Sequence, residues 1–133
     1  MSATPPLRIV DSITELSAQD AGCVAVSGSH GGLSSARYAL AARPLLAVFN
    51  DAGVGRDAAG IAALDFLQQH GLAACTVAHT SACIGQARSS YEDGVVSYAN
   101  ALAVALGLQV NLPIAGQLRG LWCLSSHSGA SRL

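Results

Sequence analysis

The chain has 133 residues, the size of one ordinary domain with a substantial core, and its net charge is −1. All seven basic residues are arginine, which excludes Schiff-base chemistry, pyridoxal-phosphate enzymes and Walker-type phosphate loops, because each needs a lysine. The arginines are scattered without a basic stripe, so we expect no nucleic-acid partner. Only 11% of residues are charged and 51% are hydrophobic, which favours a homo-oligomer that buries apolar surface between subunits.

In chain order, residues 7–13 predict a weak edge strand and residues 17–20 a short capped turn. A pattern of apolar run, polar glycine-rich segment and helix-like segment then begins. The apolar runs cover residues 23–26, 45–49 and 73–78, and the polar segments cover residues 27–32, 50–55 and 79–85. The first two polar segments lead into helices predicted over residues 33–42 and about 58–70, the second with Asp57 as N-cap and Gly71 as its end.

Two further helices are predicted, one over about residues 95–106 and one from the cap at Asn111 through Trp122. Residues 1–6 and 125–133 are rich in Ser, Pro and Gly, so we expect loosely ordered tails on one domain spanning residues 1–133. Apolar strands that alternate with helices indicate a parallel sheet covered on both faces. The predicted fold is therefore a small three-layer α/β/α sandwich with a mainly parallel sheet.

The polar segments follow the carboxyl ends of the predicted parallel strands, which is where ligands bind in open α/β sheets. This arrangement brings together His30, Asn50, Asp51 and His79. We expect His79 or His30 to transfer a proton, while Asn50 and Asp51 orient the imidazole or polarise the substrate. The neighbouring histidines also make Asp51 a candidate general acid or base. Asp51 has a simpler alternative role, in which its carboxylate only caps its own loop as an Asx-turn.

The glycine-rich segment 27–32 predicts an anion cradle, because its backbone N–H groups would point at a ligand on a helix N-terminus. A tight turn that needs glycine for steric reasons explains the same residues equally well. Arg88 is expected to close the site over a carboxylate, unless it is simply solvated. The remaining expected ligand contacts are Ser27, Gly31, Gly32, Gly53 and Ser81.

Ser29 is a candidate nucleophile, since Ser27-x-Ser29-x-Gly31 is a loose form of the nucleophile elbow. The order Ser29, Asp51, His79 is also that of the catalytic triad in α/β-hydrolases, although the chain is far too short for that fold. Cys83 is an alternative nucleophile, but an apolar cysteine packed beside Ile84 also explains it.

Two other types of site are considered and set aside. The spacing Gly53-x-Gly55-x-x-Ala58 resembles a dinucleotide fingerprint, but no acidic residue follows about 20 positions later to hold a ribose. His79 and Cys83, with His30 and Asp51, offer metal-binding atoms but lack the paired Cys and His motifs of structural zinc sites. We therefore expect neither a metal nor another cofactor.

Together these residues predict an enzyme of the hydrolase or lyase type that performs acid–base chemistry on a small anionic metabolite. The alternative is a non-catalytic metabolite-binding module or an accessory subunit of a larger assembly. The sequence has no run of about 18 apolar residues and its first six residues do not resemble a signal peptide, so we expect a cytoplasmic protein without membrane contact. Its four cysteines form no CxxC pair, so a disulfide scaffold is not expected.

Overall fold

A computed structural model describes residues 5–120, except for the side chains of residues 56 and 57. Five strands form one sheet whose spatial order follows the chain: β1 (Leu7–Val10), β2 (Val24–His30), β3 (Leu46–Asn50), β4 (Ala73–Val77) and β5 (Val96–Ala99). The first four strands are parallel, and β5 is antiparallel to β4. The predicted α/β fold, with its mainly parallel sheet and N-terminal edge strand, is confirmed.

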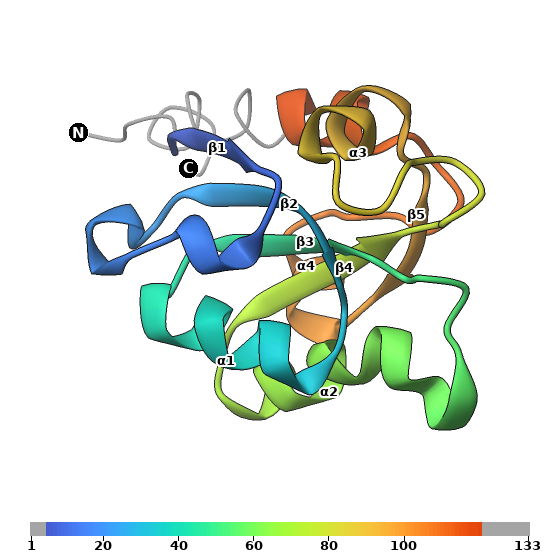
Figure 1. Cartoon of the computed structure of the whole chain (residues 1–133). Coiled ribbons are helices and arrows are strands. Elements are labelled where there is room, and N and C mark those ends of the chain that lie inside the picture. Colours follow the sequence, from blue (N-terminus) through green and yellow to red (C-terminus); the bar gives the residue numbers. More distant parts are fainter. Residues whose placement is uncertain (1–4, 121–133) are drawn as a thin grey trace.

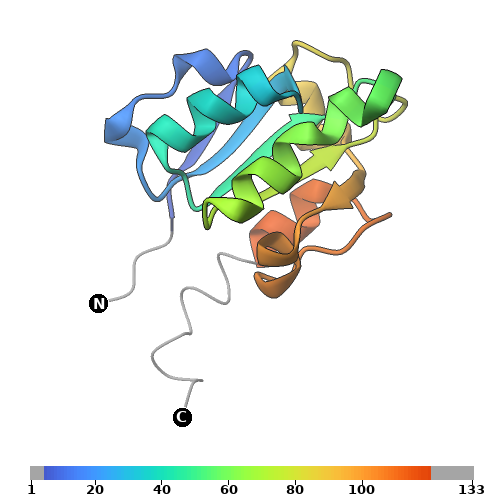
Figure 2. The same cartoon turned by 90° about the horizontal axis from the view of Figure 1, so that it is seen from below.

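Helices cover both faces of the sheet (Figures 1 and 2). One face carries α1 (Leu33–Ala42) and α2 (Ala62–Gln69), together with the 3-10 helices η1 (Ile13–Glu15) and η2 (Ala18–Asp20). Each successive parallel strand from β1 to β4 is added on the same side of the sheet, so right-handed crossovers place all of their helices on one face. After β4 the chain moves to the other face, which carries α3 (Ala87–Asp93), α4 (Ala101–Ala105) and the helical residues 114–120.

Side chains along the central strands alternate between two apolar cores. Ala25, Ala47 and Phe49 pack under α1 and α2, whereas Val26 and Val48 pack on the opposite face. All five are fully buried. Strands that are buried on both faces have no polar side to alternate with, which explains why the sequence shows them as continuous apolar runs.

The predicted loop at residues 27–32 is wrong, because β2 continues through Ser27 to His30. Ser27 donates its hydroxyl proton to the Val48 carbonyl at 2.8 Å and is fully buried. Gly28 is required by close packing, since a Cβ there would lie 2.6 Å from the backbone of Gly85. Only two glycines, 31 and 32, form the turn into α1, which spans the predicted residues.

The helix predicted from residue 58 begins later. Residues Arg56–Ile61 form the 3-10 helix η3, with Gly55 rather than Asp57 at its N-cap, and α2 starts at Ala62. Ala58 has a φ of 59°, which a right-handed α-helix does not accommodate. The end of α2 was predicted correctly, because Gly71 follows it with a φ of 78°.

The helix predicted over residues 95–106 is also wrong, since this stretch contains β5 and the short helix α4. Asn100 separates them by capping α4, where its side chain accepts from the Ala103 N–H at 2.9 Å. Residues 114–120 belong to the last predicted helix, whose expected end at Trp122 lies outside the described residues, as does the tail 125–133. Among residues 5–120, no helix is long and apolar enough to cross a membrane.

Candidate functional site

The carboxyl ends of β2, β3 and β4 lie side by side, as the site prediction requires. In the sheet register His30 pairs with Asn50, and Asn50 pairs with Val77. Asp51 directly follows β3, and its backbone N–H donates to the Val77 carbonyl at 2.9 Å. His79 lies two residues beyond the end of β4. The fold therefore brings Asp51 and His79 together from segments 28 residues apart.

Asp51 and His79 form an acid–imidazole pair. The carboxylate Oδ1 of Asp51 lies 3.3 Å from Nδ1 of His79 and also accepts the backbone N–H of His79 at 3.0 Å. Only 6% of the Asp51 side chain is exposed, whereas 54% of the His79 side chain is exposed. Nδ1 of the imidazole thus lies close to a buried carboxylate, while no described residue hydrogen-bonds Nε2.

The environment of Asp51 favours its ionised form. Burial raises the pKa of this carboxyl, but hydrogen bonds from the Gly53 N–H, the Ser97 hydroxyl and the His79 N–H outweigh burial. The nearby His79 charge acts in the same direction, so the pKa falls below the ordinary 3.8. At neutral pH the imidazole therefore faces a carboxylate anion.

Gly53 shapes the turn that holds this pair. Its φ of 75° lies in the left-handed region, and its N–H donates to Oδ1 of Asp51 at 2.8 Å. This is the Asx-turn considered from the sequence, and it coexists with the contact to His79. A Cβ on Gly53 would make an ordinary contact with the His79 ring at 3.4 Å, so the left-handed φ, and not crowding, is what favours glycine here.

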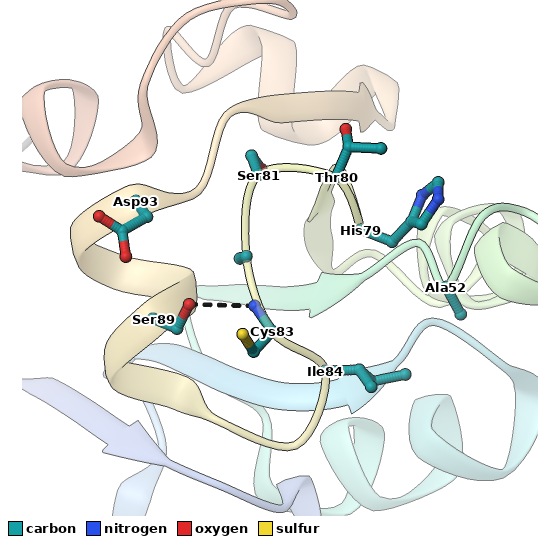
Figure 3. A pocket seen from close by; sticks show the side chains of 9 residues that line it. Ala52, His79, Thr80, Ser81, Cys83, Ile84, Ser89 and Asp93 are labelled. Atoms are coloured by element: carbon teal, nitrogen blue, oxygen red, sulfur yellow. Dashed lines mark hydrogen bonds between the residues drawn. The ribbon is translucent and has the colours of Figure 1, made fainter.

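His79 lines a pocket of about 470 Å³ where the chain passes from β4 to the opposite face of the sheet (Figure 3). The pocket volume is within the range of small-molecule sites. One wall is the 79–84 segment and the other is α3, whose Ser89 accepts the Cys83 N–H at 3.0 Å. The lining residues are Ala52, His79, Thr80, Ser81, Ala82, Cys83, Ile84, Ser89 and Asp93.

Several predicted site residues have structural contacts and do not line this pocket. Ser29 accepts the Ile13 N–H at 2.9 Å, and the His30 ring lies against Gly32. Gly31 donates its N–H to the Asn50 carbonyl at 2.9 Å, so this group of the expected anion cradle already has an acceptor. Arg88 is exposed on α3 and pairs with Glu92 at 3.1 Å.

The side chain of Asn50 is fully buried and has both ends bonded. Its Oδ1 accepts the Ala52 N–H at 2.8 Å, and its Nδ2 donates to the Ala82 carbonyl at 3.1 Å. Ser81 does line the pocket, although its hydroxyl donates to the Ala78 carbonyl and accepts the Val95 N–H. These contacts hold the turn after β3 and the segment after β4 in place beside the pocket.

Within the described part of the chain, no three His, Cys, Asp or Glu side chains group as metal ligands would. Cys83 is exposed, so the explanation of a packed apolar cysteine is wrong. Cys23 and Cys75, by contrast, are buried free thiols. The pocket lining therefore includes one exposed thiol and one imidazole.

Sequence reasoning missed Asp93, Ser89 and Ser97. The first two are brought to the pocket by α3, which was not predicted because residues 87–93 have only two buried positions. Ser97 lies on β5, which was predicted as helix. The run Val95-Val96-Ser97-Tyr98 after Gly94 is rich in β-branched and aromatic residues, and this signal would have indicated a strand.

Comparison with known proteins gives no match to this chain among family models, curated proteins or solved structures.

Proposed function

We propose that this protein is an enzyme of the hydrolase or lyase type in which His79 transfers a proton to or from a small metabolite. The observation that carries the proposal is the contact between Oδ1 of Asp51 and Nδ1 of His79, a residue that lines the pocket. A carboxylate at Nδ1 favours the tautomer with its proton on that nitrogen and stabilises the imidazolium formed during catalysis. Nε2 is then the basic atom available to a ligand.

This pair supports two related reactions. In hydrolysis, Nε2 takes a proton from a water molecule as its oxygen attacks the substrate, and the imidazolium returns that proton to the leaving group. In a lyase reaction, Nε2 takes a proton from carbon, and the electrons of the C–H bond form a double bond as the bond to the leaving group breaks. The imidazolium then gives that proton to the leaving group. Neither reaction requires an oxidant or a cofactor.

The charges around the pocket bear on the substrate. The sequence predicted an anionic metabolite, but the cradle on which that prediction rested is largely strand β2. Asp93 is exposed at the C-terminal end of α3 and forms no ion pair within residues 5–120. A carboxylate at that end of a helix opposes the helix dipole and attracts cations. We therefore expect a substrate whose end near Asp93 is cationic or a hydrogen-bond donor.

The function is tested by incubating the protein with a cellular metabolite extract and following all small molecules by mass spectrometry. The expected result is that wild-type protein consumes a metabolite and His79→Ala does not. The control is His70→Ala, because His70 lies at the end of α2 and contacts Phe66 instead of the pocket. Saturable binding without consumption would favour the binding module, and unchanged turnover in His79→Ala would overturn the role of His79.

The expected charge of the substrate is tested separately with benzylamine and benzoate as matched probes. Backbone amide shifts of residues 80–84 should respond to benzylamine in wild-type protein and respond less in Asp93→Asn. A stronger response to benzoate would restore the anionic substrate predicted from the sequence.

A homo-oligomer in the cytoplasm remains part of the proposal. Its support is the low charge of the chain and the exposed apolar side chains Val104, Ile84, Tyr38 and Leu33, which are 47–55% exposed. Light scattering of the purified protein tests this expectation, and a monomer at all concentrations would contradict it.

A further inference from the structure

The charged residues are distributed unevenly along the chain. Residues 94–118 form its longest stretch without Asp, Glu, Lys or Arg. This stretch supplies β5, α4 and the start of the helical residues 114–120. In the fold, α4 packs beside β4 and β5, at the edge of the sheet away from β1 (Figure 2). One side of the molecule is therefore built from a segment that contributes no charged side chain.

The helix α4 is apolar on every side, because residues 101–105 are Ala-Leu-Ala-Val-Ala. A helix with this composition is normally buried all round. In the single chain only Ala103 is fully buried, whereas Ala101 and Val104 are exposed. Val104 is 55% exposed, more than any other large hydrophobic side chain in the described part of the chain. The isolated chain thus leaves one side of an apolar helix in contact with water.

An apolar hollow of about 220 Å³ lies beside α4. A cavity of about 150 Å³ holds a benzene molecule, so this hollow can accept a branched aliphatic side chain. It lies at the amino ends of β3 and β4, whereas Asp51 and His79 follow their carboxyl ends. A molecule seated in the hollow would therefore leave the His79 pocket open. None of the lining residues is polar, and they are Leu45, Gly71, Ala73, Leu102, Ala105 and Leu106.

The same helix carries a side chain that suits this hollow. Successive residues of an α-helix are turned by about 100°, so the helix has distinct flanks. Leu102 and Ala105, which line the hollow, lie on one flank of α4, and Val104 lies on the other. The exposed Ala101 lies between the two flanks. A two-fold axis that runs along α4 would place Val104 of each copy over the hollow of the other.

We propose that a second copy of this chain covers α4, with Val104 of each copy seated in the hollow of the other. A two-fold contact brings residues near their own copies, so charged residues close to the axis meet like charges. Residues 94–118 avoid this repulsion. A partner of another kind would not need the protruding side chain and the hollow on the same helix. The proposal rests on the homo-oligomer of the proposed function, but not on its chemistry.

Sedimentation velocity of the full chain over a range of concentrations tests the proposal. Val104→Asp should weaken dimerisation at least about a hundredfold, because each dimer would bury two unpaired carboxylates. Tyr38→Asp is the matched control, since Tyr38 is 49% exposed on α1, on the other face of the sheet, and its substitution should leave dimerisation unchanged. Val104→Ala keeps α4 helical and should weaken dimerisation by about tenfold, which guards against a folding defect in Val104→Asp.

The possible outcomes separate this proposal from the proposed function. A wild-type protein that is monomeric at all concentrations would overturn both this proposal and the homo-oligomer. A dimer that survives Val104→Asp would overturn only the choice of this face. Absence of turnover would leave the dimer result standing.

Photo-crosslinking identifies what occupies the hollow. Benzoylphenylalanine is incorporated at position 104, and proteins labelled with 14N and 15N are mixed so that links between copies can be recognised. A link from one copy to the Leu45 or Gly71 peptide of the other copy is the expected result. A link within one copy to residues 121–133 would overturn the proposal, because that segment of the same chain would then fill the hollow.

Discussion

Asp51→Asn isolates the charge of the buried carboxylate, because the two side chains have nearly the same shape. In the wild-type protein Oδ1 of Asp51 accepts two backbone N–H bonds, at 2.8 and 3.0 Å. Hydrogen bonds to a charged acceptor stabilise a fold by about 1 kcal/mol more than neutral ones, so the substitution should cost about 2 kcal/mol at pH 7. At roughly 4 °C per kcal/mol for a domain of this size, Tm should fall by about 8 °C.

The pH dependence of this difference follows from the lowered pKa of Asp51. In the unfolded chain the carboxyl titrates near 3.8, and in the folded protein it titrates below that value. Its contribution is therefore fully present above pH 3.8 and is lost as the pH falls through the folded-state pKa. The difference in free energy of unfolding between wild type and Asp51→Asn should therefore narrow as the pH falls below 3.8.

Urea denaturation of both proteins from pH 7 down to pH 3 measures this gap. His70→Ala, which leaves the Asp51 contacts intact, serves as the reference for pH effects elsewhere. Surface substitutions usually change the free energy of unfolding by less than about 0.5 kcal/mol, so a loss that small in Asp51→Asn at pH 7 would refute the reasoning. A difference from wild type that widens on acidification would refute it as well.

Three further predictions concern packing, capping and thiol reactivity. Gly31→Ala would drive a Cβ into a backbone oxygen of η3 and should lower the free energy of unfolding in urea by about 1–3 kcal/mol. The control Gly116→Ala lies in helical residues 114–120 and should raise that free energy by roughly 0.5–1 kcal/mol. Equal effects of the two substitutions would contradict this prediction. Asn100→Ala removes the hydrogen-bond partner of four backbone groups and should lower the free energy of unfolding by at least about 3 kcal/mol. A loss below about 1 kcal/mol would count against a stabilising role of these four hydrogen bonds. Iodoacetamide should label exposed Cys83 but not Cys75, whose pKa burial raises to about 12; peptide mapping that finds modified Cys75 in native protein would contradict this.

The edge of the sheet that carries the site could be predicted because each strand has a local signature. Three short apolar runs end in polar residues, and parallel pairing then places Asp51 and His79 at the same edge. The prediction was wrong where glycine has two explanations. Gly28 was interpreted as part of a loop, whereas it lies inside β2 and is needed because the backbone at Gly85 approaches it.

The other wall of the pocket depends on contacts that no local pattern contains. Asn100 bonds backbone groups that lie in α2, before and within β4, and in α4, and these partners decide that a helix starts there. The apolar spacing of residues 95–106 by itself favours one continuous helix. The positions of Asp93 and Ser97 follow from the tertiary arrangement of α3 and β5, so neither could be assigned to the site from the sequence.

The most direct test of the central claim is the tautomer of His79, measured through the two imidazole nitrogens by 15N NMR of labelled protein. The contact between Oδ1 of Asp51 and Nδ1 of His79 predicts that the neutral ring carries its proton on Nδ1, which leaves Nε2 free as the base. In Asp51→Asn this preference should weaken. A neutral ring protonated mainly on Nε2 in the wild-type protein would contradict the proposed role of the pair.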